Sequence, residues 1–437
     1  MDSLFVLFKL AYLVLCSSED VTLSVSSSTT FGRDESCTRE SCSRTRRYLL
    51  YDVNPGEGFN LRRDVYLRAA IFLKHLNDRD TKNEWTLVLP PWGPLYHWQR
   101  RDIPQEGLPW SLFFDILSLN SYVPVMEFDD YLAERKLPVI EQIFYLLSFD
   151  FDKIDLQSEW LLEEANCDEI PAFPYVTNPQ EQHVEGWIWG YAGISPKKIQ
   201  CYRTLGSADS IISRLLALTS TKDRAVMFER FENVLHDHFS GKEYWAARKS
   251  MKFAKNLVEL AENFRKEFLS QMETDHEVTY SATATNESTG GPYICAHLRR
   301  QDYLRARPDE VPSMKEAALQ LRHVFRKQSL NTVFVATDGT DQEIKELKGA
   351  LGPGFNVVTY RPPENLLQKI KEGGAAIVEQ ITCSHSKYFI GSYESTFSFR
   401  IQEERELMGF SPDTTFNRFC KFSHAKCQQP TQWRVEL

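Results

Sequence analysis

The sequence predicts an α/β protein with two domains, each built on a parallel sheet. The chain has 437 residues, which is enough for two or three domains. Short apolar runs of strand length alternate with segments of helical period, first from residue 48 and again from residue 293. A polar stretch rich in Thr, Ser, Ala and Gly, residues 274–291, separates the two series. We therefore expect two Rossmann-like domains that face a cleft, residues 48–245 and residues 246–437.

The first series opens with a continuous apolar run, residues 48–53, which ends at a Pro-Gly turn and is typical of a buried parallel strand. Apolar residues then recur at helical spacing over residues 61–76. We expect further strands at residues 86–89 and 123–128, and helices at residues 109–119, 224–239 and 251–268. Residues 150–205 are less regular and contain several prolines, so we interpret them as an insertion.

The second series shows the same alternation without detectable sequence similarity to the first. We expect strands at residues 293–298, 332–336, 355–360 and 388–390, and helices at residues 314–327, 341–351 and 396–407. Because open α/β sheets bind ligands at the carboxyl ends of their strands, polar residues at these ends are the candidates for chemistry.

The N-terminal residues predict that the protein enters the secretory pathway. An apolar run at residues 4–15, broken only by Lys9, resembles a secretory signal peptide over residues 1–20. A polar lead-in follows at residues 21–46. No other stretch is long and apolar enough to cross a bilayer, so we expect a soluble protein of the secretory pathway without a membrane span. The net charge of −9 argues against a nucleic-acid partner.

The nine cysteines fit an oxidising compartment, where disulfides form. Two pairs that are close in sequence, Cys167 with Cys201 and Cys420 with Cys427, are the best candidates, although spacing alone does not settle connectivity. Two further cysteines, Cys295 and Cys383, lie in apolar runs and are expected to be buried thiols. No spacing indicates a metal site.

Two short motifs bear on the same compartment. Asn286 begins an N-glycosylation sequon in the polar linker. The last four residues, 434–437, loosely resemble a KDEL-type retention signal but differ from it at two of four positions, so chance explains them better.

The first candidate for chemistry is Glu57, which stands between Gly56 and Gly58 directly after the first predicted strand. Glycines let the backbone bend tightly and let a ligand approach closely. A carboxylate at this end of a parallel strand lies where α/β sheets bind ligands. A surface glutamate in an ordinary turn is an equally good interpretation of this stretch alone.

The second candidate is the pair Arg299 and Arg300, which follows the strand at residues 293–298. An arginine in this place is able to grip a diphosphate through two parallel charge-assisted hydrogen bonds. Alternation along the strand sends the two side chains to opposite sides, so we expect one to hold ligand and the other to pair with Asp302. A plain Arg–Asp salt bridge is the alternative.

The third candidate is the start of the last predicted helix, at Ser395 and Thr396. The first backbone N–H groups of a helix are free and its dipole favours an anion there. Plain N-capping by the same hydroxyl groups is the commoner use. Upstream, Glu379 is placed either to accept hydrogen bonds from a guanine edge or to lie on a solvated helix face.

Together these motifs resemble the GDP-fucose protein O-fucosyltransferases, and within that family the type that modifies thrombospondin type 1 repeats. The matching residues are 54–60, 297–300 and 395–400, and the resemblance extends from about residue 48 to the C-terminus. It implies a GT-B fold and an inverting, metal-independent transfer without a cofactor. It implies contacts with the donor GDP-fucose or the acceptor at Gly56, Glu57, Gly58, Phe59, Asn60, His297, Leu298, Arg299, Glu379, Thr396 and Phe397.

The implied chemistry follows from the residue types. An inverting transfer needs a base opposite the leaving group, and Glu57 is the expected general base for the acceptor hydroxyl. The resemblance places this base and the acceptor on the N-terminal domain, residues 48–245, and GDP-fucose on the C-terminal domain, residues 246–437. Arg299 and the helix start near Thr396 would stabilise the charge that gathers on the departing GDP. The implied acceptor is a folded, disulfide-rich repeat in the lumen of the endoplasmic reticulum.

Two alternatives stay open at this point. An enzyme that modifies EGF repeats would share the same chemistry. A secretory-pathway binding protein or folding helper would keep the nucleotide motifs but lack a working base, and the presence of both Glu57 and Arg299 argues against it.

Overall fold

The computed structural model describes residues 44–136, 139–148, 161–178, 183–186, 188–189, 191, 194–220, 222–236, 238–270, 290–415 and 417–422. The predicted signal peptide, almost all of the lead-in and most of the polar linker lie outside these residues. So do Asn286, Cys427 and the C-terminal tetrapeptide.

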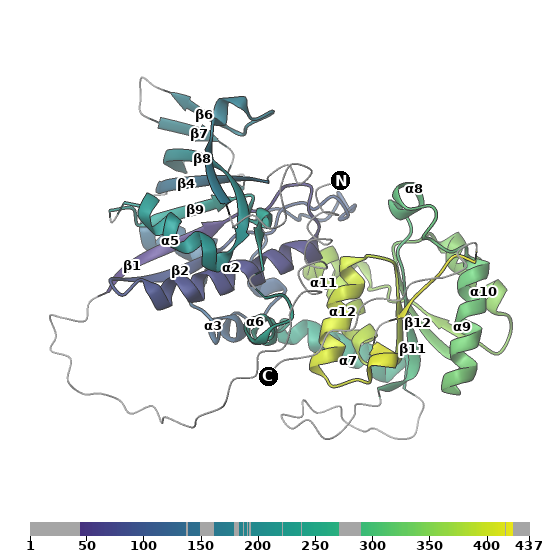
Figure 1. Cartoon of the computed structure of the whole chain (residues 1–437). Helices are drawn as coiled ribbons and strands as arrows, with labels where there is room; N and C mark the ends of the chain where they lie inside the picture. Colours follow the sequence, from purple (N-terminus) through teal and green to yellow (C-terminus); the bar gives the residue numbers. More distant parts are fainter. Residues whose placement is uncertain are drawn as a thin grey trace, which may run out of the picture. The chain divides into compact units, whose positions relative to one another are not determined.

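The chain divides into two compact units (Figure 1). The first contains the residues up to Pro55 together with Val65–Pro90 and Asn120–Phe239. The second contains Gly56–Asp64, Pro91–Leu119 and the chain from Ser240 onward. The loop that carries Glu57 therefore belongs to the same unit as Arg299.

The first unit is built on an eight-stranded sheet with the order β10-β8-β4-β9-β1-β2-β3, to which β5 adds at β8. All pairings along this path are parallel, and only the β5–β8 pair is antiparallel. The strands are β1 (Thr45–Tyr51), β2 (Asn83–Leu89), β3 (Val125–Glu127), β4 (Val139–Ser148), β5 (Leu161–Ala165), β8 (Ser195–Ser207), β9 (Ala225–Glu229) and β10 (Val234–Leu235). A separate hairpin joins β6 (Tyr175–Asn178) to β7 (His183–Gly186).

The predicted first strand and helix are confirmed as β1 and α2 (Phe59–Arg79). Tyr48, Leu49, Leu50 and Tyr51 are buried, which explains why this strand reads as a continuous apolar run. Two further helices, α4 (Phe128–Arg135) and α5 (Ala208–Leu218), belong to the same unit.

The predicted helix at residues 224–239 is wrong. This segment forms β9, a 3-10 turn η4 (Phe231–Asn233) and β10. All five residues of β9 are buried, and the strand pairs with both β1 and β4. Pairing on both sides of a central strand outweighs the helical spacing of its apolar residues.

The interpretation of residues 150–205 as an insertion is wrong for part of this stretch, because it supplies β5 and most of β8 to the eight-stranded sheet. The same stretch contains the predicted disulfide. Cys167, in the 3-10 turn η3 (Cys167–Glu169), is bonded to Cys201 on β8, with the two Cα atoms 5.4 Å apart. The prediction for this pair is confirmed.

The second unit is built on a five-stranded parallel sheet with the order β13-β12-β11-β14-β15. Its strands are β11 (Gly291–Leu298), β12 (Thr332–Thr337), β13 (Asn356–Val358), β14 (Ser386–Gly391) and β15 (Asn417–Arg418). Its helices include α6 (Lys242–Ser250), α7 (Lys255–Phe268), α8 (Tyr303–Ala306), α9 (Met314–Gln328), α10 (Asp341–Leu351), α11 (Glu364–Ser384), α12 (Thr396–Leu407) and α13 (Pro412–Thr415). Figure 1 shows α9 and α10 on one side of this sheet and α7, α11 and α12 on the other.

The strands and helices predicted for the second series are confirmed in type and order. Capping boxes begin two of the helices, with Ser313 and Glu316 at α9 and Thr340 and Glu343 at α10. The predicted helix at residues 109–119 is wrong in its middle, since it forms a 3-10 turn η1 (Trp110–Leu112) and a short helix α3 (Ile116–Asn120). The break occurs where Phe114 forms a β-bridge with Phe253.

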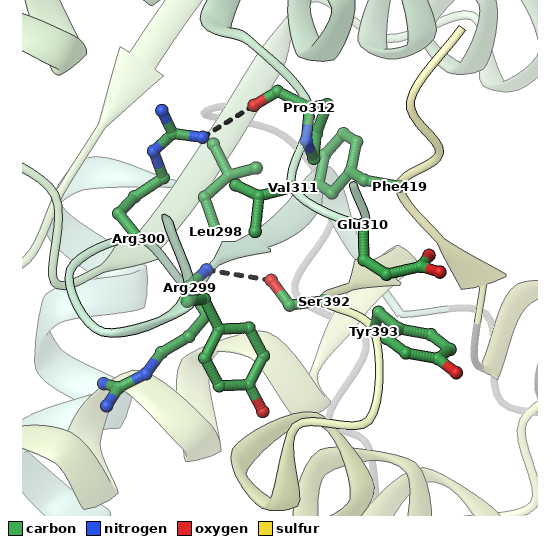
Figure 2. Close-up of a pocket in the computed structure, with 10 residues that line it drawn as sticks. Leu298, Arg299, Arg300, Glu310, Val311, Pro312, Ser392, Tyr393 and Phe419 are labelled. Carbon is green, nitrogen blue, oxygen red and sulfur yellow. Dashed lines mark hydrogen bonds between the residues drawn. The ribbon is translucent and has the colours of Figure 1, made fainter. Parts of the chain in front are cut away.

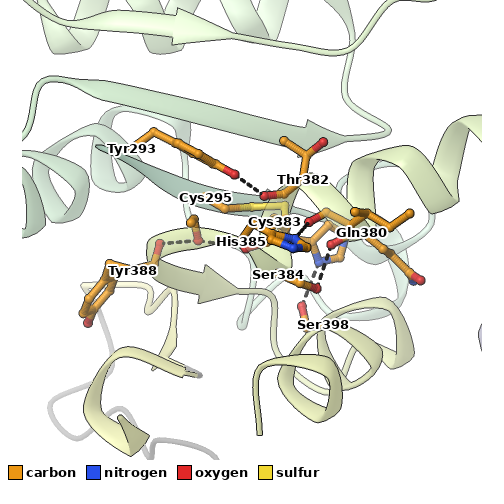
Figure 3. Close-up of a disulfide and its surroundings, with 12 residues drawn as sticks. Tyr293, Cys295, Gln380, Thr382, Cys383, Ser384, His385, Tyr388 and Ser398 are labelled. Carbon is orange, nitrogen blue, oxygen red and sulfur yellow. Dashed lines mark hydrogen bonds between the residues drawn. A yellow bond between two sulfur atoms is a disulfide. The ribbon is translucent and has the colours of Figure 1, made fainter. Parts of the chain in front are cut away.

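A disulfide joins Cys295 on β11 to Cys383 on α11 (Figure 3). The expectation of two buried thiols is therefore wrong in its chemistry, although both residues are buried. The two cysteines are 88 positions apart in the sequence, and their pairing arises because α11 packs against β11. Cys420 is also disulfide-bonded. Among the described helices, none is both long enough and apolar enough to cross a membrane.

Candidate active site

Ser392, directly after β14, fixes the carboxyl end of β11 (Figure 2). Its hydroxyl group donates to the carbonyl oxygen of His297 at 2.9 Å and accepts from the backbone N–H of Arg299 at 2.8 Å. The two bonds set the direction in which the chain leaves the strand. Leu298, between the two bonded residues, packs in the core, so only its backbone is available to a ligand.

The side chain of Arg299 lies between two carboxylates. Its Nη2 is 2.9 Å from Oδ1 of Asp302 and its Nη1 is 2.8 Å from Oδ2 of Asp338. Burial works against its charge, yet Asp338 and Asp302 raise the pKa of Arg299 above its usual value. The guanidinium is therefore a permanent cation that is only one-fifth exposed.

The neighbouring Arg300 points the other way, as alternation along the strand predicts (Figure 2). Its Nε donates to Glu343 at 2.7 Å and its Nη1 donates to the carbonyl oxygen of Pro312 at 2.6 Å. It is buried and serves the fold. Asp302 pairs with Arg299, so the Arg–Asp salt bridge that the sequence left open as an alternative is present. Arg300 pairs with Glu343 instead.

His297 and Phe397 stack on one another, with ring centroids 4.5 Å apart. Nδ1 of His297 lies 2.8 Å from Oγ of Ser398, which also accepts the backbone N–H of Ser392. Burial and the charge of Arg299 lower the pKa of His297 to about 3, so the ring is neutral at physiological pH.

The start of α12 is not capped by its N-cap side chain. Ser395 occupies the N-cap position and its hydroxyl group makes no capping hydrogen bond. The backbone N–H groups at Thr396 and the next residue thus open a twelve-residue helix whose dipole favours an anion. Of the two interpretations offered by the sequence, plain side-chain capping by Ser395 is excluded.

The Glu57 loop is packed against the segment that follows β2. A Cβ atom on Gly58 would lie 3.1 Å from Cε1 of His97 and 3.5 Å from Cε1 of Tyr96, so a glycine is needed for this close approach. In the same segment, Nε2 of Gln99 donates to Oε1 of Gln301 at 2.8 Å, which brings it against the turn after β11.

The electrostatics of Tyr96 and His97 place the same groups near one another. The pKa of Tyr96 is raised above its usual value, mainly by burial. The charges of Asp302 and Glu57 raise it further, and the charge of Arg299 opposes them. Burial and Arg299 lower the pKa of His97 to about 4. A carboxylate loop, two aromatic rings and a permanent cation thus lie within one group of side chains in the second unit.

Residues 48–408 match the family model described as GDP-fucose protein O-fucosyltransferase. The chain belongs to this family.

The relatives named GDP-fucose protein O-fucosyltransferase 2 are similar over most of the chain. The human protein is 44% identical over 398 residues, which are 89% of this chain and 90% of that protein. The Caenorhabditis elegans protein is 38% identical over 433 residues, 98% of this chain and 99% of that protein. The Drosophila melanogaster protein is 37% identical over 408 residues, 89% of this chain and 82% of that protein.

Among solved structures, POFUT1 in complex with GDP-fucose is similar with a TM-score of 0.54 and 16% identity, covering 86% of this chain and 99% of that chain. POFUT1 in complex with GDP has the same TM-score at 15% identity. These likenesses identify the fold as GT-B, as expected. Family membership makes the chain a glycosyltransferase, a GDP-fucose O-fucosyltransferase.

In this O-fucosyltransferase, two of the predicted site residues have structural partners of their own. Phe59 is buried in an aromatic cluster, with its ring 4.7 Å from Trp92 and 5.5 Å from Phe113. Oδ1 of Asn60 accepts from Gln380 at 2.7 Å and from Arg63 at 3.2 Å.

Glu379 lies on α11 of the O-fucosyltransferase and is half-buried. Burial raises its pKa to about 8, while Arg361 lowers it and Asp338 raises it. Asp338 is also the partner of Arg299, so Glu379 and Arg299 are both coupled to this aspartate.

Sequence reasoning missed four residues of this group: Tyr96, His97, Asp338 and Ser392. Asp338 directly follows β12, and a carboxylate at the end of a parallel strand is the same signal that identified Glu57. Tyr96 and His97 follow a Pro-rich turn after β2 and carry no motif. Within the described part of the O-fucosyltransferase, no three His, Cys, Asp or Glu side chains gather to form a metal site.

Proposed function

We propose that this chain transfers fucose from GDP-fucose to Ser or Thr hydroxyl groups of folded thrombospondin type 1 repeats, with inversion at the anomeric carbon. Its relatives named GDP-fucose protein O-fucosyltransferase 2 support the donor, and the resemblance of its motifs supports the acceptor class. The residues assigned to the reaction are Glu57, Arg299 and the start of α12.

Glu57 acts as the general base in this proposal. The acceptor hydroxyl has to lose its proton as its oxygen attacks C1 of fucose, and a carboxylate is the suitable proton acceptor. Gly56 directly precedes Glu57 and has no side chain that would hinder an acceptor chain on that flank of the carboxylate, while Gly58 on the other flank is packed against His97 and Tyr96.

Arg299 stabilises the leaving group. As the bond from C1 to the β-phosphate oxygen breaks, negative charge gathers on the diphosphate of GDP. The guanidinium of Arg299 and the uncapped N–H groups at Thr396 supply positive potential that is fixed before the reaction starts. No step in this account calls for a metal ion or a cofactor.

One observation carries the proposal. Tyr96 and His97 pack on Gly58, and Arg299 contributes to the pKa shifts of both rings. The loop of Glu57 and the guanidinium of Arg299 are therefore neighbours of the same two rings, which supports the assignment of a base and a leaving-group stabiliser to one site.

The deciding experiment incubates the purified chain with GDP-fucose and either a folded thrombospondin type 1 repeat or a folded EGF repeat. The mass of the intact repeat reports transfer, and NMR of the product reports the anomeric configuration. We expect a fucosylated thrombospondin repeat with inverted configuration and no product with the EGF repeat or with a reduced, unfolded repeat.

Modification of the EGF repeat alone would assign the other acceptor class. Absence of transfer to either repeat, with GDP-fucose bound, would make the chain a binding protein. Glu57→Gln is the matched variant: it should bind GDP-fucose like the parent and lose transfer. If this variant transfers fucose at the parental rate, Glu57 is not the general base.

The lumen of the endoplasmic reticulum is the proposed compartment. Two disulfides in the described residues, Cys167–Cys201 and Cys295–Cys383, fit an oxidising environment. Folded, disulfide-bonded acceptor repeats are produced in the same environment.

A further inference from the structure

Three polar side chains form a closed hydrogen-bonded ring at the start of α2. Nη1 of Arg63 donates to Oε1 of Gln380 at 2.7 Å and to Oδ1 of Asn60 at 3.2 Å. Nε2 of Gln380 donates to the same Oδ1 of Asn60 at 2.7 Å. The ring ties the first turn of α2 to the middle of α11 within the second unit.

The guanidinium of Arg63 determines which atoms donate and which accept in each hydrogen bond of this ring. A guanidinium only donates, so the atom of Gln380 that faces Arg63 has to be the oxygen. That orientation turns the amide nitrogen of Gln380 toward Asn60, which meets it with Oδ1. Two donors converge on this oxygen, and a flipped Asn60 amide would set donor against donor.

The Asn60 amide therefore presents its nitrogen to the outside of the ring. Among the described residues, none accepts a hydrogen bond from Nδ2 of Asn60. Asn60 stands three positions after Glu57, and Glu379 directly precedes Gln380. The ring thus joins the loop assigned to the base with the helix turn assigned to the guanine contact.

Burial of the charged Arg63 side chain in this ring is unfavourable in free energy. The side chain of Arg63 is fully buried, and its guanidinium lies 4.9 Å from the ring centroid of Phe253. Within the described part of the chain, its Nε and Nη2 have no hydrogen-bond partner. Burial, with the charges of Arg248 and Arg400, lowers the pKa of Arg63 well below its usual value. An apolar residue would fill this place at lower cost, so the directed bonds of Arg63 call for a functional explanation.

We propose that Arg63 and Gln380 are positioning residues that hold the Asn60 amide with Nδ2 directed at an oxygen atom of bound GDP-fucose. This inference rests on the proposed function for the identity of the ligand. The oxygen belongs either to a hydroxyl group of the sugar or to the diphosphate, and both accept a hydrogen bond from an amide.

Gln380→Glu tests the proposal without removing bulk. The new carboxylate still accepts from Arg63 and supplies a counter-charge to it, so the melting temperature should not fall. It no longer donates to Asn60, and the Asn60 amide has to rotate to donate to it. We expect kcat/KM for fucose transfer to fall at least tenfold, the equivalent of one lost hydrogen bond of good geometry.

Gln320→Glu is the matched control. Gln320 on α9 donates to the carbonyl oxygen of Cys420 at 2.8 Å and accepts from its N–H at 2.9 Å, so the same isosteric change breaks a comparable bond elsewhere in the unit. This variant should transfer fucose at the rate of the parent.

A double-mutant cycle separates positioning from general loss of structure. If Gln380 acts only through Asn60, the variant with both Asn60→Ala and Gln380→Glu should be as active as Asn60→Ala alone. Losses that add, or a parental kcat/KM for Gln380→Glu, would overturn the proposal.

Calorimetric titration with GDP and with GDP-fucose completes the test and needs no acceptor. Weaker binding of GDP-fucose alone in Gln380→Glu assigns Nδ2 to the sugar, and weaker binding of both ligands assigns it to the diphosphate. Parental affinity for both ligands overturns the proposal. A parent chain that binds GDP-fucose but modifies no repeat would refute the proposed function, while the titration would still decide the role of the ring.

Discussion

The carboxylate of Asp338 lies 2.8 Å from the guanidinium of Arg299. Its second oxygen accepts the backbone N–H of Arg300 at 2.6 Å, so the aspartate is fixed to the same turn that it stabilises. Arg299 is therefore held in place before any ligand binds, and the field that it applies is preorganised.

Replacing Asp338 should disturb Arg299 without unfolding the chain. Asp338→Asn keeps an acceptor for the N–H of Arg300 but removes the charge that orients Arg299, leaving Asp302 as its ion-pair partner. We expect kcat/KM for transfer to fall about 10- to 100-fold, as a small misplacement of a catalytic group does. Steady-state kinetics with GDP-fucose checks this, and Asp341→Asn on α10, which is 90% exposed, is the control. Equal activity of the two variants would contradict the role of Asp338.

Gly58 should tolerate no side chain. In Gly58→Ala the new Cβ would lie 3.1 Å from His97, and either the ring or the Glu57 loop would have to move. We expect transfer to fall while the melting temperature changes little. Gly93→Ala is the control, because a Cβ there meets nothing within 4 Å. Partial recovery of transfer in the double variant with His97→Ala would identify the ring as the obstacle.

Glu379 should make stability depend on pH. Its pKa is raised to about 8, so the folded chain keeps a proton that the unfolded chain loses near pH 4.5. Stability then falls as the pH rises between these two values, because the unfolded state binds fewer protons there. Glu379→Gln removes this term. The variant should gain in melting temperature relative to the parent as the pH rises from about 5 to about 8, and a constant difference would show that the carboxyl group is not perturbed.

Glu403 should be essential for the stability of the second unit. This fully buried carboxylate lies 2.8 Å from Arg248 and 2.8 Å from Arg400 and accepts from the hydroxyl group of Tyr244. Glu403→Gln leaves two buried cations without their shared partner, which should cost about 3–5 kcal/mol of unfolding free energy.

Urea unfolding measures this loss. Glu364→Gln, which breaks the ion pair with Arg100, is the control and should cost far less because both side chains are exposed. Similar losses in the two variants would contradict the buried-cluster argument.

Most strands and helices of the second unit were predictable because each of them carries its own local signal, but the helix α11 was not predicted. Its strands are short buried runs, and two of its helices begin with capping boxes. The helix predicted at residues 224–239 failed because the two neighbours of β9, β1 and β4, are distant in sequence. Pairing between strands that are distant in sequence produces no hydrophobic periodicity that a local prediction would detect.

The candidate site was predictable where a polar residue ends a strand. Glu57 and Arg299 were found in this way, and Asp338 has the same signal. Tyr96 and His97 were not predictable, because they reach the site from an irregular segment whose path depends on aromatic packing around Trp92 and Phe59. The disulfide between Cys295 and Cys383 was missed for the same reason, since it depends on how α11 crosses β11.

That disulfide has a consequence for how the enzyme matures. It joins the strand that leads to Arg299 covalently to the helix that bears Glu379, so the two ends of the proposed nucleotide site are linked by one disulfide. Protein made in a reducing cytosol would lack this disulfide, and its affinity for GDP should lag until an oxidant is supplied. The chain would then become able to bind GDP-fucose only late, when its own disulfides form.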